Sequence, residues 1–391
     1  MVNVCRLPSA VFYPHHFTTS QLHYFPNTMS HHILFTGGGT LGPVTPLLSV
    51  AAQWRRRDPD VRCSWIGTPK GPERLLIEGA KIPFSELSAP RMNRYRKWTY
   101  LFIPLHMAWS MWKASKMLRE MKPDMVLSAG AYVSVPVVFM AWCMRIPVWI
   151  HELDMRPGLA NRVMAPFAKR ISTTWTESAA AYSAKKTSVV GTMVRGTLAL
   201  GDRVSARDRY GLRPDLPTVL ILGGGTGATS LNEAMLIIAD EVLRVANVIH
   251  LTGRGKMIPA LQSFQEQGKL YVALEFLHEG IADAYAAADI VVARAGMGTI
   301  SELAALGKPS IILPLPGSQQ EENAKALQAQ EAADVIYHMT PQVLLQAIVK
   351  MVQSNEYRTE RAEHIRRIFP VNADERIVHD ALEILSARVT S

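Results

Sequence analysis

The chain has 391 residues, of which 48% are apolar and 19% charged, a composition that supplies buried cores and excludes a disordered or fibrous protein. At about 150 residues per domain, this length predicts two domains. The net charge of +9 suits a negatively charged partner, such as nucleic acid, anionic lipid or a phosphorylated ligand. The three cysteines have no CxxC spacing, which excludes a disulfide scaffold and a cysteine-based zinc site.

The N-terminal segment and one apolar stretch need separate treatment. Residues 1–28 lack the basic start and apolar core of a secretory signal, and Met29 stands just before the first strong strand. We therefore expect residues 1–28 to be a poorly ordered extension.

The longest uncharged stretch, Met125 to Met144, is long enough to span a bilayer. Gly130 and Pro136 within it predict a strand, a glycine turn and a helix instead.

From Ile33 onward, apolar strands alternate with helices, which predicts parallel sheets built from βαβ units. In the first half, strands are expected at Ile33–Thr36, Arg62–Ile66, Met125–Ser128, Pro147–Ile150, Arg170–Thr174 and Ser188–Val190, and helices at Leu47–Trp54, Glu73–Ile77, Pro104–Met121 and Pro136–Met144. In the second half, strands are expected at Thr218–Leu222, Asn247–Leu251, Leu270–Leu274, Ile290–Ala293 and Ser310–Pro314, and helices at Leu231–Val245, Ile281–Ala287, Thr299–Leu306 and Glu321–Ala332. The charged segment Gly196–Leu216 is the expected linker, and a last helix at about Asp374–Leu385 could belong to either half.

A glycine motif occurs twice, as TGGGTLG from Thr36 and as LGGGTGA from Leu222, each time between a strand and a helix. This repeat predicts two doubly wound α/β domains of similar design, each with a glycine loop at the carboxyl edge of its first strand. Ligands bind at that edge, and two such edges facing each other would form a deep cleft.

Both glycine loops match the GxGxxG/A pattern of dinucleotide-binding enzymes. That pattern also requires an acidic residue at the end of the next strand, but here those strands lead into Ile66-Gly67-Thr68 and Thr252-Gly253-Arg254. A nicotinamide-dependent enzyme is therefore disfavoured. The glycines allow backbone N–H groups to approach an anion or a sugar at a helix N-terminus, although tight turns alone would also explain them.

The segment RAGMGTISE, from Arg294 to Glu302, follows a strand and opens a helix. Thr299 or Ser301 could cap this helix, and Gly298 could expose N–H groups to a diphosphate. We expect Glu302 in the first turn, where its carboxylate could accept hydrogen bonds from both hydroxyls of a ribose or complete a capping box.

Two further polar motifs carry weaker signals. Gln319 and Gln320 follow a strand, where their amides could bind sugar hydroxyls or simply begin a helix. The DxD at Asp58-Pro59-Asp60 precedes its strand and is expected to be a solvated turn rather than a metal site.

Together these motifs resemble the MurG-type family of nucleotide-sugar glycosyltransferases. The resemblance is carried by GGTLGPVTP (Gly38–Pro46), SAGAYVSVP (Ser128–Pro136), HELD (His151–Asp154), GTMVR (Gly191–Arg195), GGGTGA (Gly223–Ala228), RAGMGTISE (Arg294–Glu302) and QQEENA (Gln319–Ala324). It implies the GT-B fold, an α/β architecture of two Rossmann-like doubly wound parallel-sheet domains facing a deep cleft. Residues 29–195, joined by the C-terminal helix at about 374–391, would form the acceptor and membrane-facing domain. Residues 196–373 would form the UDP-sugar donor domain.

The same resemblance implies a substrate pair and site residues. The reaction would be an inverting transfer of N-acetylglucosamine from UDP-N-acetylglucosamine, as co-substrate, to lipid I, giving lipid II, with no metal and no further cofactor. Donor-binding positions would be Thr40, Leu41, Gly42, Asp154, Arg195, Gly225, Thr226, Leu277, Met297, Gly298, Thr299, Ser301, Glu302, Gln319 and Gln320. On the acceptor side would lie Gly39, Pro43, Tyr132 and Ser134.

The chain departs from the family pattern at several positions: Leu41 replaces a glycine, Pro43 a histidine and Asp154 an asparagine, GTMVR stands for GNPVR, and GGGTGA stands for GGSQGA. An inverting transfer needs a base to deprotonate the acceptor hydroxyl, and proline cannot act as one. Glu152 and Asp154 are the remaining candidates for the base, and His151 is the third. Alternatively, His151 and Glu152 only pin the loop that follows their strand.

Basic and aromatic residues interleave between Arg91 and Lys122, where Glu120 is the one acidic residue. The proposed membrane patch is Arg94, Arg96, Lys97, Trp98 and Phe102. This pattern suits an anionic bilayer surface, although a solvated helix face would also explain it. No RNA- or DNA-binding motif accompanies it, so a nucleic-acid partner is not expected.

The resemblance implies a peripheral protein at the cytoplasmic face of the inner (plasma) membrane, acting in peptidoglycan synthesis and so in cell wall biogenesis, cell shape and cell division. Three alternatives stay open: a transferase with another lipid or glycan acceptor, a UDP-N-acetylglucosamine 2-epimerase and a non-catalytic relative. The oligomeric state is also open.

Overall fold

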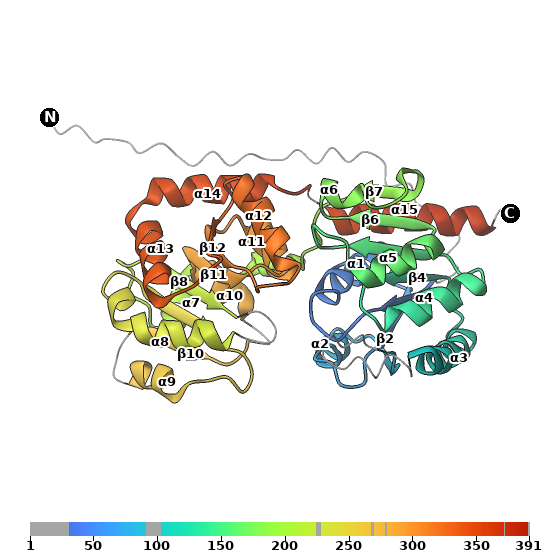
Figure 1. Cartoon of the computed structure of the whole chain (residues 1–391), viewed down its shortest axis with the longest axis horizontal. Helices are drawn as coiled ribbons and strands as arrows, with labels where there is room; N and C mark the ends of the chain where they lie inside the picture. Colours follow the sequence, from blue (N-terminus) through green and yellow to red (C-terminus); the bar gives the residue numbers. More distant parts are fainter. Residues whose placement is uncertain are drawn as a thin grey trace. The chain divides into compact units, whose positions relative to one another are not determined.

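The structure is a computed structural model that describes residues 31–90, 103–223, 228–266, 270–277, 280–370 and 372–389. Two parallel sheets with flanking helices organise these residues (Figure 1). The predicted class, two doubly wound parallel-sheet α/β domains, is confirmed. The expected N-terminal extension, residues 1–28, lies outside the described residues.

The first half forms a seven-stranded sheet in the order β3-β2-β1-β4-β5-β6-β7. Its strands are β1 (His32–Thr36), β2 (Arg62–Gly67), β3 (Phe84–Glu86), β4 (Met125–Ser128), β5 (Val148–Glu152), β6 (Arg170–Thr173) and β7 (Thr187–Val189). Its helices are α1 (Thr45–Arg57), α2 (Glu73–Gly79), α3 (Ile103–Met121), α4 (Ser134–Cys143), α5 (Leu159–Met164) and α6 (Thr176–Ala179), with 3-10 turns η2 (Ala165–Phe167) and η3 (Ala184–Lys186). β4 and α4 therefore occupy the uncharged stretch in which a strand, a turn and a helix are predicted.

Alternate residues of β1 pack on opposite faces of this sheet, as the two-residue repeat of a strand requires. Ile33 and Phe35 belong to the apolar cluster that contains Trp54 of α1. Leu34 belongs to the cluster that contains Leu118 of α3. The central strands are buried because helices cover both faces of a parallel sheet.

The second half forms a six-stranded sheet in the order β10-β9-β8-β11-β12-β13. Its strands are β8 (Thr218–Leu222), β9 (Asn247–Leu251), β10 (Tyr271–Leu274), β11 (Ile290–Arg294), β12 (Ser310–Leu313) and β13 (Asp334–Val335). Its helices are α7 (Arg203–Arg209), α8 (Thr229–Leu243), α9 (Pro259–Glu266), α10 (Ile281–Ala287), α11 (Met297–Leu306), α12 (Gln320–Ala329), α13 (Pro341–Gln353) and α14 (Asn355–Arg367), preceded by the 3-10 turn η4 (Gly196–Leu200).

Both sheets reverse their strand order at the first strand of the half. β1 pairs with β2 on one side and β4 on the other, and β8 pairs likewise with β9 and β11. In doubly wound sheets the crevice at such a reversal is where ligands bind. The glycine loops that follow β1 and β8 therefore lie at these two points.

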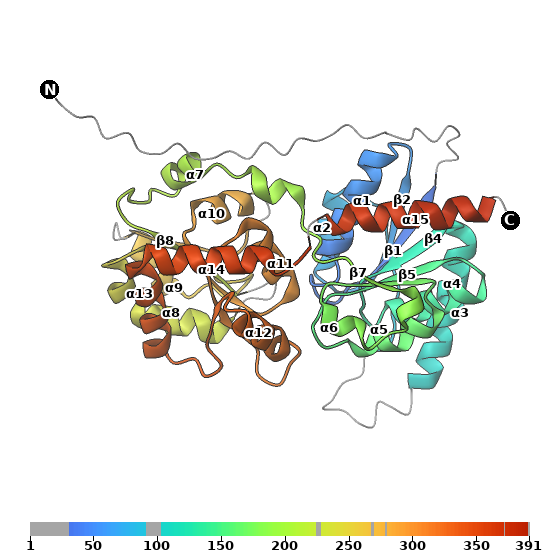
Figure 2. The same cartoon turned by 90° about the horizontal axis from the view of Figure 1, so that it is seen from above.

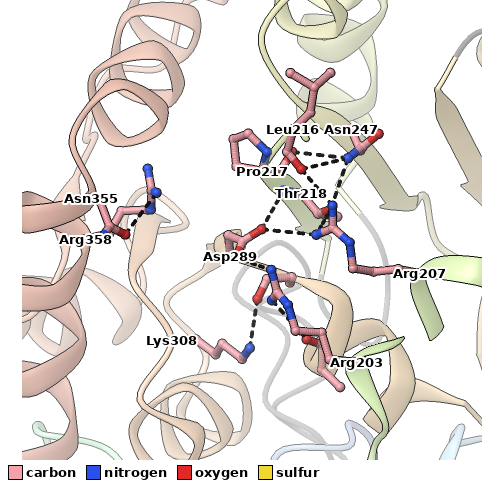
Figure 3. Close-up of polar contacts among 12 residues, drawn as sticks. Arg203, Arg207, Leu216, Pro217, Thr218, Asn247, Asp289, Lys308, Asn355 and Arg358 are labelled. Atoms are coloured by element: carbon pink, nitrogen blue, oxygen red, sulfur yellow. Dashed lines mark hydrogen bonds and ion pairs between the residues drawn. The ribbon is translucent and has the colours of Figure 1, made fainter. Parts of the chain in front are cut away.

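The segment 196–216, predicted to be the linker, joins β7 to β8 and packs against the second half through η4 and α7. Figure 3 shows Arg203 and Arg207 of α7 reaching Asp289, which lies just before β11. Asp289 Oδ1 accepts a hydrogen bond from Arg203 at 2.7 Å, and Oδ2 accepts one from the backbone N–H of Thr218 at 2.9 Å. Arg207 adds an ion pair to Asp289 at 3.5 Å and a hydrogen bond to the Leu216 carbonyl at 2.8 Å. Arg203 and Arg207 of this segment are thus paired with Asp289 in the body of the second half.

The C-terminal helix α15 (Ala373–Val389) lies beside α1 of the first half (Figure 2). The Ser49 hydroxyl donates to Asp374 Oδ2 at 2.8 Å, and Arg388 donates to the Arg145 carbonyl at 2.9 Å. Ile377 and Leu385 of α15 belong to the same apolar cluster as Trp54 of α1. The chain thus returns to the first half after completing the second.

Candidate functional site

The first glycine loop follows β1 and leads through a turn into α1. Gly39 has a φ of +81°, in the left-handed region where glycine is favoured, and the Tyr132 ring lies 3.2 Å from the point where a Cβ would stand. Two predicted acceptor-side residues are therefore neighbours. Ser134 is fully buried, and its hydroxyl donates to the Gly130 carbonyl at 2.8 Å, so it supports the loop of Tyr132 from within. Thr40 is exposed, and Leu41, Gly42 and Pro43 are half-buried.

Glu152 ends β5 with a carboxylate that is only 2% exposed and fully engaged. Its Oε1 accepts from the Asp154 N–H at 3.2 Å, and its Oε2 accepts from the Gly158 N–H at 3.1 Å. Oε2 also accepts from Asn161 Nδ2 at 3.0 Å and from the Tyr182 hydroxyl at 2.8 Å. Burial raises the pKa of Glu152 to about 7, against the opposing effect of these hydrogen bonds. This carboxylate shapes the loop 153–158.

His151 is 1% exposed, and both ring nitrogens have partners inside the sheet. Nδ1 lies 2.9 Å from the Ser172 hydroxyl, and Nε2 lies 3.1 Å from the Thr174 hydroxyl. Burial lowers the pKa of His151 to about 3, so the ring stays neutral at physiological pH. A neutral, enclosed and doubly partnered imidazole is a poor candidate for a base that must reach a substrate.

The loop 153–158 forms three hydrogen bonds with α12 of the second half and its N-cap residue Gln319. Asn323 Nδ2 donates to Asp154 Oδ1 at 2.9 Å, and the Met155 N–H donates to Asn323 Oδ1 at 2.9 Å. Gln319 Nε2 donates to the Arg156 carbonyl at 3.2 Å. Burial raises the pKa of Asp154 above its ordinary value, opposed by the Asn323 hydrogen bond. The amide of Asn323 thus binds the loop by both its donor and its acceptor.

The helix α11 begins earlier than predicted. Its N-cap is Gly296, and no side chain caps it, so the prediction that Thr299 or Ser301 caps the helix is wrong. Met297 is the first helical residue, and its sulfur accepts from Trp175 Nε1 at 3.3 Å. At Gly298, a Cβ would stand 3.5 Å from the Thr45 hydroxyl at the start of α1. The first turn of α11 therefore has backbone N–H groups without a side-chain cap, next to the first half.

Glu302 lies in the second turn of α11 rather than the first, because the helix starts at Met297. The Tyr285 hydroxyl donates to Glu302 Oε2 at 2.8 Å, and Arg195 Nη2 lies 3.7 Å from Oε1. Burial raises the pKa of Glu302, while Tyr285 and Arg195 lower it. Glu302 takes no part in a capping box, and its partners come from α10 and the end of the first half.

The remaining predicted donor residues have varied settings. Gln319 is exposed, and Gln320 Oε1 accepts from the Leu315 N–H of its own loop at 3.0 Å. Leu277 is half-buried against the core. The Ser301 hydroxyl is buried, without a hydrogen-bond partner among the described residues. Gly225 and Thr226, together with the membrane-patch residues Arg94, Arg96, Lys97, Trp98 and Phe102, lie outside the described residues.

Sequence reasoning missed Asn323, Tyr285 and Tyr182, although each holds a predicted site carboxylate. Asn323 lies within the motif QQEENA, and this was the one feature of the sequence that could have identified it as a site residue. Metal-ligating groups come together elsewhere: the described residues contain the trios Glu331/Glu360/His364 and His379/Asp380/Glu383. Neither trio includes a predicted site residue.

Comparisons with known proteins agree with this arrangement. The glycosyltransferase family 28 N-terminal domain matches residues 33–173, and the family 28 C-terminal domain matches residues 218–376. The UDP-N-acetylglucosamine--N-acetylmuramyl-(pentapeptide) pyrophosphoryl-undecaprenol N-acetylglucosamine transferase of Legionella pneumophila (strain Paris) is 34% identical over 335 residues, covering 84% of this chain and 91% of that protein. The protein of the same name from Lachnospira eligens is 37% identical over 283 residues, covering 72% of this chain and 78% of that protein.

Solved structures give the same result. MurG of Acinetobacter baumannii is 28% identical with a TM-score of 0.67, covering 89% of this chain and 98% of that one. A UDP-GlcNAc 2-epimerase from Neisseria meningitidis has a TM-score of 0.64 at 15% identity, covering 91% of this chain and 100% of that one, a likeness in fold alone. The two sheets, the two family domains and the full-length relatives lead to one assignment: the chain belongs to glycosyltransferase family 28, in which it groups with the MurG proteins.

Proposed function

We propose that the protein transfers N-acetylglucosamine from UDP-N-acetylglucosamine to N-acetylmuramyl-(pentapeptide) pyrophosphoryl-undecaprenol, the lipid-linked acceptor in its relatives' names. The observation that carries this proposal is the match to those transferases through both domains, at 34% identity over 84% of the chain. The 2-epimerase alternative has support only from neighbours that share the fold at low identity.

The second half supplies the donor site in this proposal. The uncapped first turn of α11 presents N–H groups and the positive end of a helix dipole, which together stabilise a diphosphate. The Glu302 carboxylate would accept hydrogen bonds from ribose hydroxyls, because its oxygens have capacity beyond the bond from Tyr285. Arg195, close to Glu302, would add positive charge as UDP leaves.

Asp154 is our choice for the base. Glu152 accepts hydrogen bonds from four donors and is almost fully enclosed, so an acceptor hydroxyl has no access to it. Asp154 is half-buried, and its Oδ1 accepts from Asn323, which lies four residues beyond Gln319. A pKa raised by burial also makes Asp154 a stronger base than an ordinary aspartate. Asn323 would orient Asp154 toward the sugar-binding region.

The proposed reaction follows from these roles. Asp154 removes the proton from the acceptor hydroxyl as the oxygen attacks the anomeric carbon of N-acetylglucosamine. The bond from that carbon to the β-phosphate oxygen breaks with inversion, and its electron pair leaves with UDP. The α11 N-terminus and Arg195 stabilise the charge that develops on the diphosphate.

Turnover with purified lipid acceptor tests the function directly. The protein should release UDP from UDP-N-acetylglucosamine only when the lipid-linked muramyl-pentapeptide is present. Formation of UDP-N-acetylmannosamine without acceptor would indicate an epimerase instead. Donor binding with neither product would indicate a non-catalytic relative.

We also propose that the face formed by α3 contacts an anionic membrane surface. Leu105, Trp109 and Trp112 of this helix are 72%, 45% and 63% exposed. Lys113 lies 5.4 Å from the ring centre of Trp109, which places a cation beside the exposed aromatic surface. Exposed tryptophan next to basic side chains favours the interface of an anionic bilayer. None of the described helices has the length and hydrophobicity needed to traverse a bilayer.

Replacing both Trp109 and Trp112 with serine should weaken binding to anionic vesicles by about 100-fold or more, because each substitution removes apolar surface worth roughly 1.5 kcal/mol or more. Vesicle sedimentation measures this, with Ile237→Ser as the matched control, since Ile237 is 65% exposed on α8 of the second half. UDP affinity should be unchanged in both variants. Equal vesicle binding by wild type and the double variant would show that α3 does not contact the membrane.

A further inference from the structure

Glu73, the first residue of α2, has a carboxylate that is completely buried beneath the first glycine loop. Its Oε2 accepts from the Gly39 N–H at 3.2 Å, and its Oε1 accepts from the Thr68 N–H at 2.8 Å and from the Thr68 hydroxyl. One side chain therefore joins the loop after β1, the loop after β2 and the start of α2. The carboxylate also lies in the first turn of a helix, where the dipole favours negative charge.

The glycines around Glu73 leave room for this carboxylate and for little else. A Cβ at Gly38 would stand 2.1 Å from Glu73 Oε1, and a Cβ at Gly71 would stand 1.8 Å from Oε2. Gly38 and Gly71 are thus required by the close approach of the backbone to Glu73. This accounts for part of the glycine motif without any ligand.

Gly39 is held from two sides, by Glu73 at its N–H and by the Tyr132 ring, 3.2 Å from its Cβ position. Because Gly39 adopts a left-handed φ, the backbone there has few other restraints of its own. The direction in which Thr40 to Pro43 leave Gly39 therefore depends on these two contacts. Those residues are the ones that the family resemblance places beside the substrates.

We propose that Glu73 is a positioning residue for the transfer reaction, which holds the glycine loop in its working shape through Gly39 and Thr68. This inference rests on the proposed function. Glu73 itself touches no substrate, because it is fully enclosed. Its contribution to the reaction is to keep the Gly39–Pro43 backbone, and the acceptor beside it, in place as the new glycosidic bond forms.

The test is Glu73→Gln, which keeps the length of the side chain but places an NH2 group among three donors. Acceptor kcat/KM should fall by about 10–100-fold, the usual effect of losing a charged hydrogen-bond acceptor. UDP affinity should change much less, because the UDP contacts proposed for α11, Glu302 and Arg195 lie outside this loop. The matched control is Asp289→Asn, since Asp289 also accepts from a backbone N–H, that of Thr218, but at the opposite edge of the other sheet (Figure 3). The control should lose thermal stability and keep its acceptor kcat/KM.

Thr68→Val provides a milder variant in case Glu73→Gln fails to fold. It removes one donor to Glu73 and should lower acceptor kcat/KM by a few fold, whereas Thr68→Ser should restore the wild-type value. Hydrogen exchange of residues 37–45 gives a readout that needs no turnover, and we expect at least about tenfold faster exchange there in Glu73→Gln, with no change in α11.

The outcomes separate this proposal from the proposed function. The wild-type protein could fail to turn over the lipid-linked acceptor while amide hydrogens of residues 37–45 still exchange faster in Glu73→Gln. In that case the proposed acceptor is wrong, but the conclusion that Glu73 holds the loop is supported. If Glu73→Gln and Thr68→Val lose stability but keep both wild-type acceptor kinetics and wild-type loop exchange, Glu73 is only a structural anchor and the proposal is overturned.

Discussion

Asp154→Asn should lower the turnover number with the lipid-linked acceptor by about 10²–10⁴-fold, the usual contribution of general base catalysis. Asparagine keeps the shape of aspartate but cannot accept a proton. UDP affinity should change little, because the donor contacts proposed for α11 and Glu302 stay in place. Steady-state kinetics with saturating donor would measure the loss.

Two further variants check the assignment of the base. Glu152→Gln should lower stability by disturbing the loop 153–158, since its amide cannot accept from all four present donors. Pro43→His places an imidazole where the resembled family has one. If Pro43→His raises activity while Asp154→Asn has no effect, Asp154 is not the base.

The pH dependence of activity follows from the same assignment. The base must be ionised, and burial raises the pKa of Asp154. As pH is lowered, activity should therefore begin to fall at a higher pH than it would with an exposed aspartate.

Glu152 makes the free energy of unfolding depend on pH. Its folded pKa of about 7 exceeds its ordinary 4.5, so its stabilising contribution is complete below pH 4.5 and lost as pH rises through 7.

Glu302→Ala should weaken UDP binding by about 10–150-fold while the fold stays intact. Losing a charged partner of two ribose hydroxyls costs roughly 1.5–3 kcal/mol, and 1.4 kcal/mol corresponds to tenfold. Calorimetric titration with UDP measures the effect. Tyr285→Phe is the matched control, because it removes the hydroxyl that donates to Glu302 at 2.8 Å but leaves the carboxylate. It should have a smaller effect, and unchanged affinity in Glu302→Ala would reduce Glu302 to a structural partner of Tyr285 and Arg195.

The sequence allowed the sheets and the positions of the glycine loops to be predicted, because buried strands and the motifs that end them are local patterns. It could not predict the contacts that organise the site. Asn323 binds Asp154 across 169 residues of sequence, and Glu73 binds Gly39 across 34. No spacing rule connects such pairs, since the fold alone brings them together.

Local sequence patterns were insufficient at the start of α11 and in the segment 196–216. RAGMGTISE contains three residues able to begin a helix, and the structure uses Gly296 rather than Thr299 or Ser301. The charges of the segment 196–216 indicated a linker but not its partner: Asp289, more than 70 residues later, pairs with Arg203 and Arg207. In the second case the partner lies outside the window in which the pattern is read.

The return of α15 to the first half has a consequence for synthesis on the ribosome. The face of α1 that α15 covers is translated long before α15 itself, because the whole six-stranded half emerges between them. At about 5–20 residues per second, the roughly 315 residues between α1 and α15 take roughly 15–65 s. During it the nascent first half lacks the packing of Ile377 and Leu385, and Ser49 of α1 lacks its hydrogen bond to Asp374. The window of greatest aggregation risk therefore falls during translation, and chaperone binding to ribosome-bound chains should be strongest before α15 emerges.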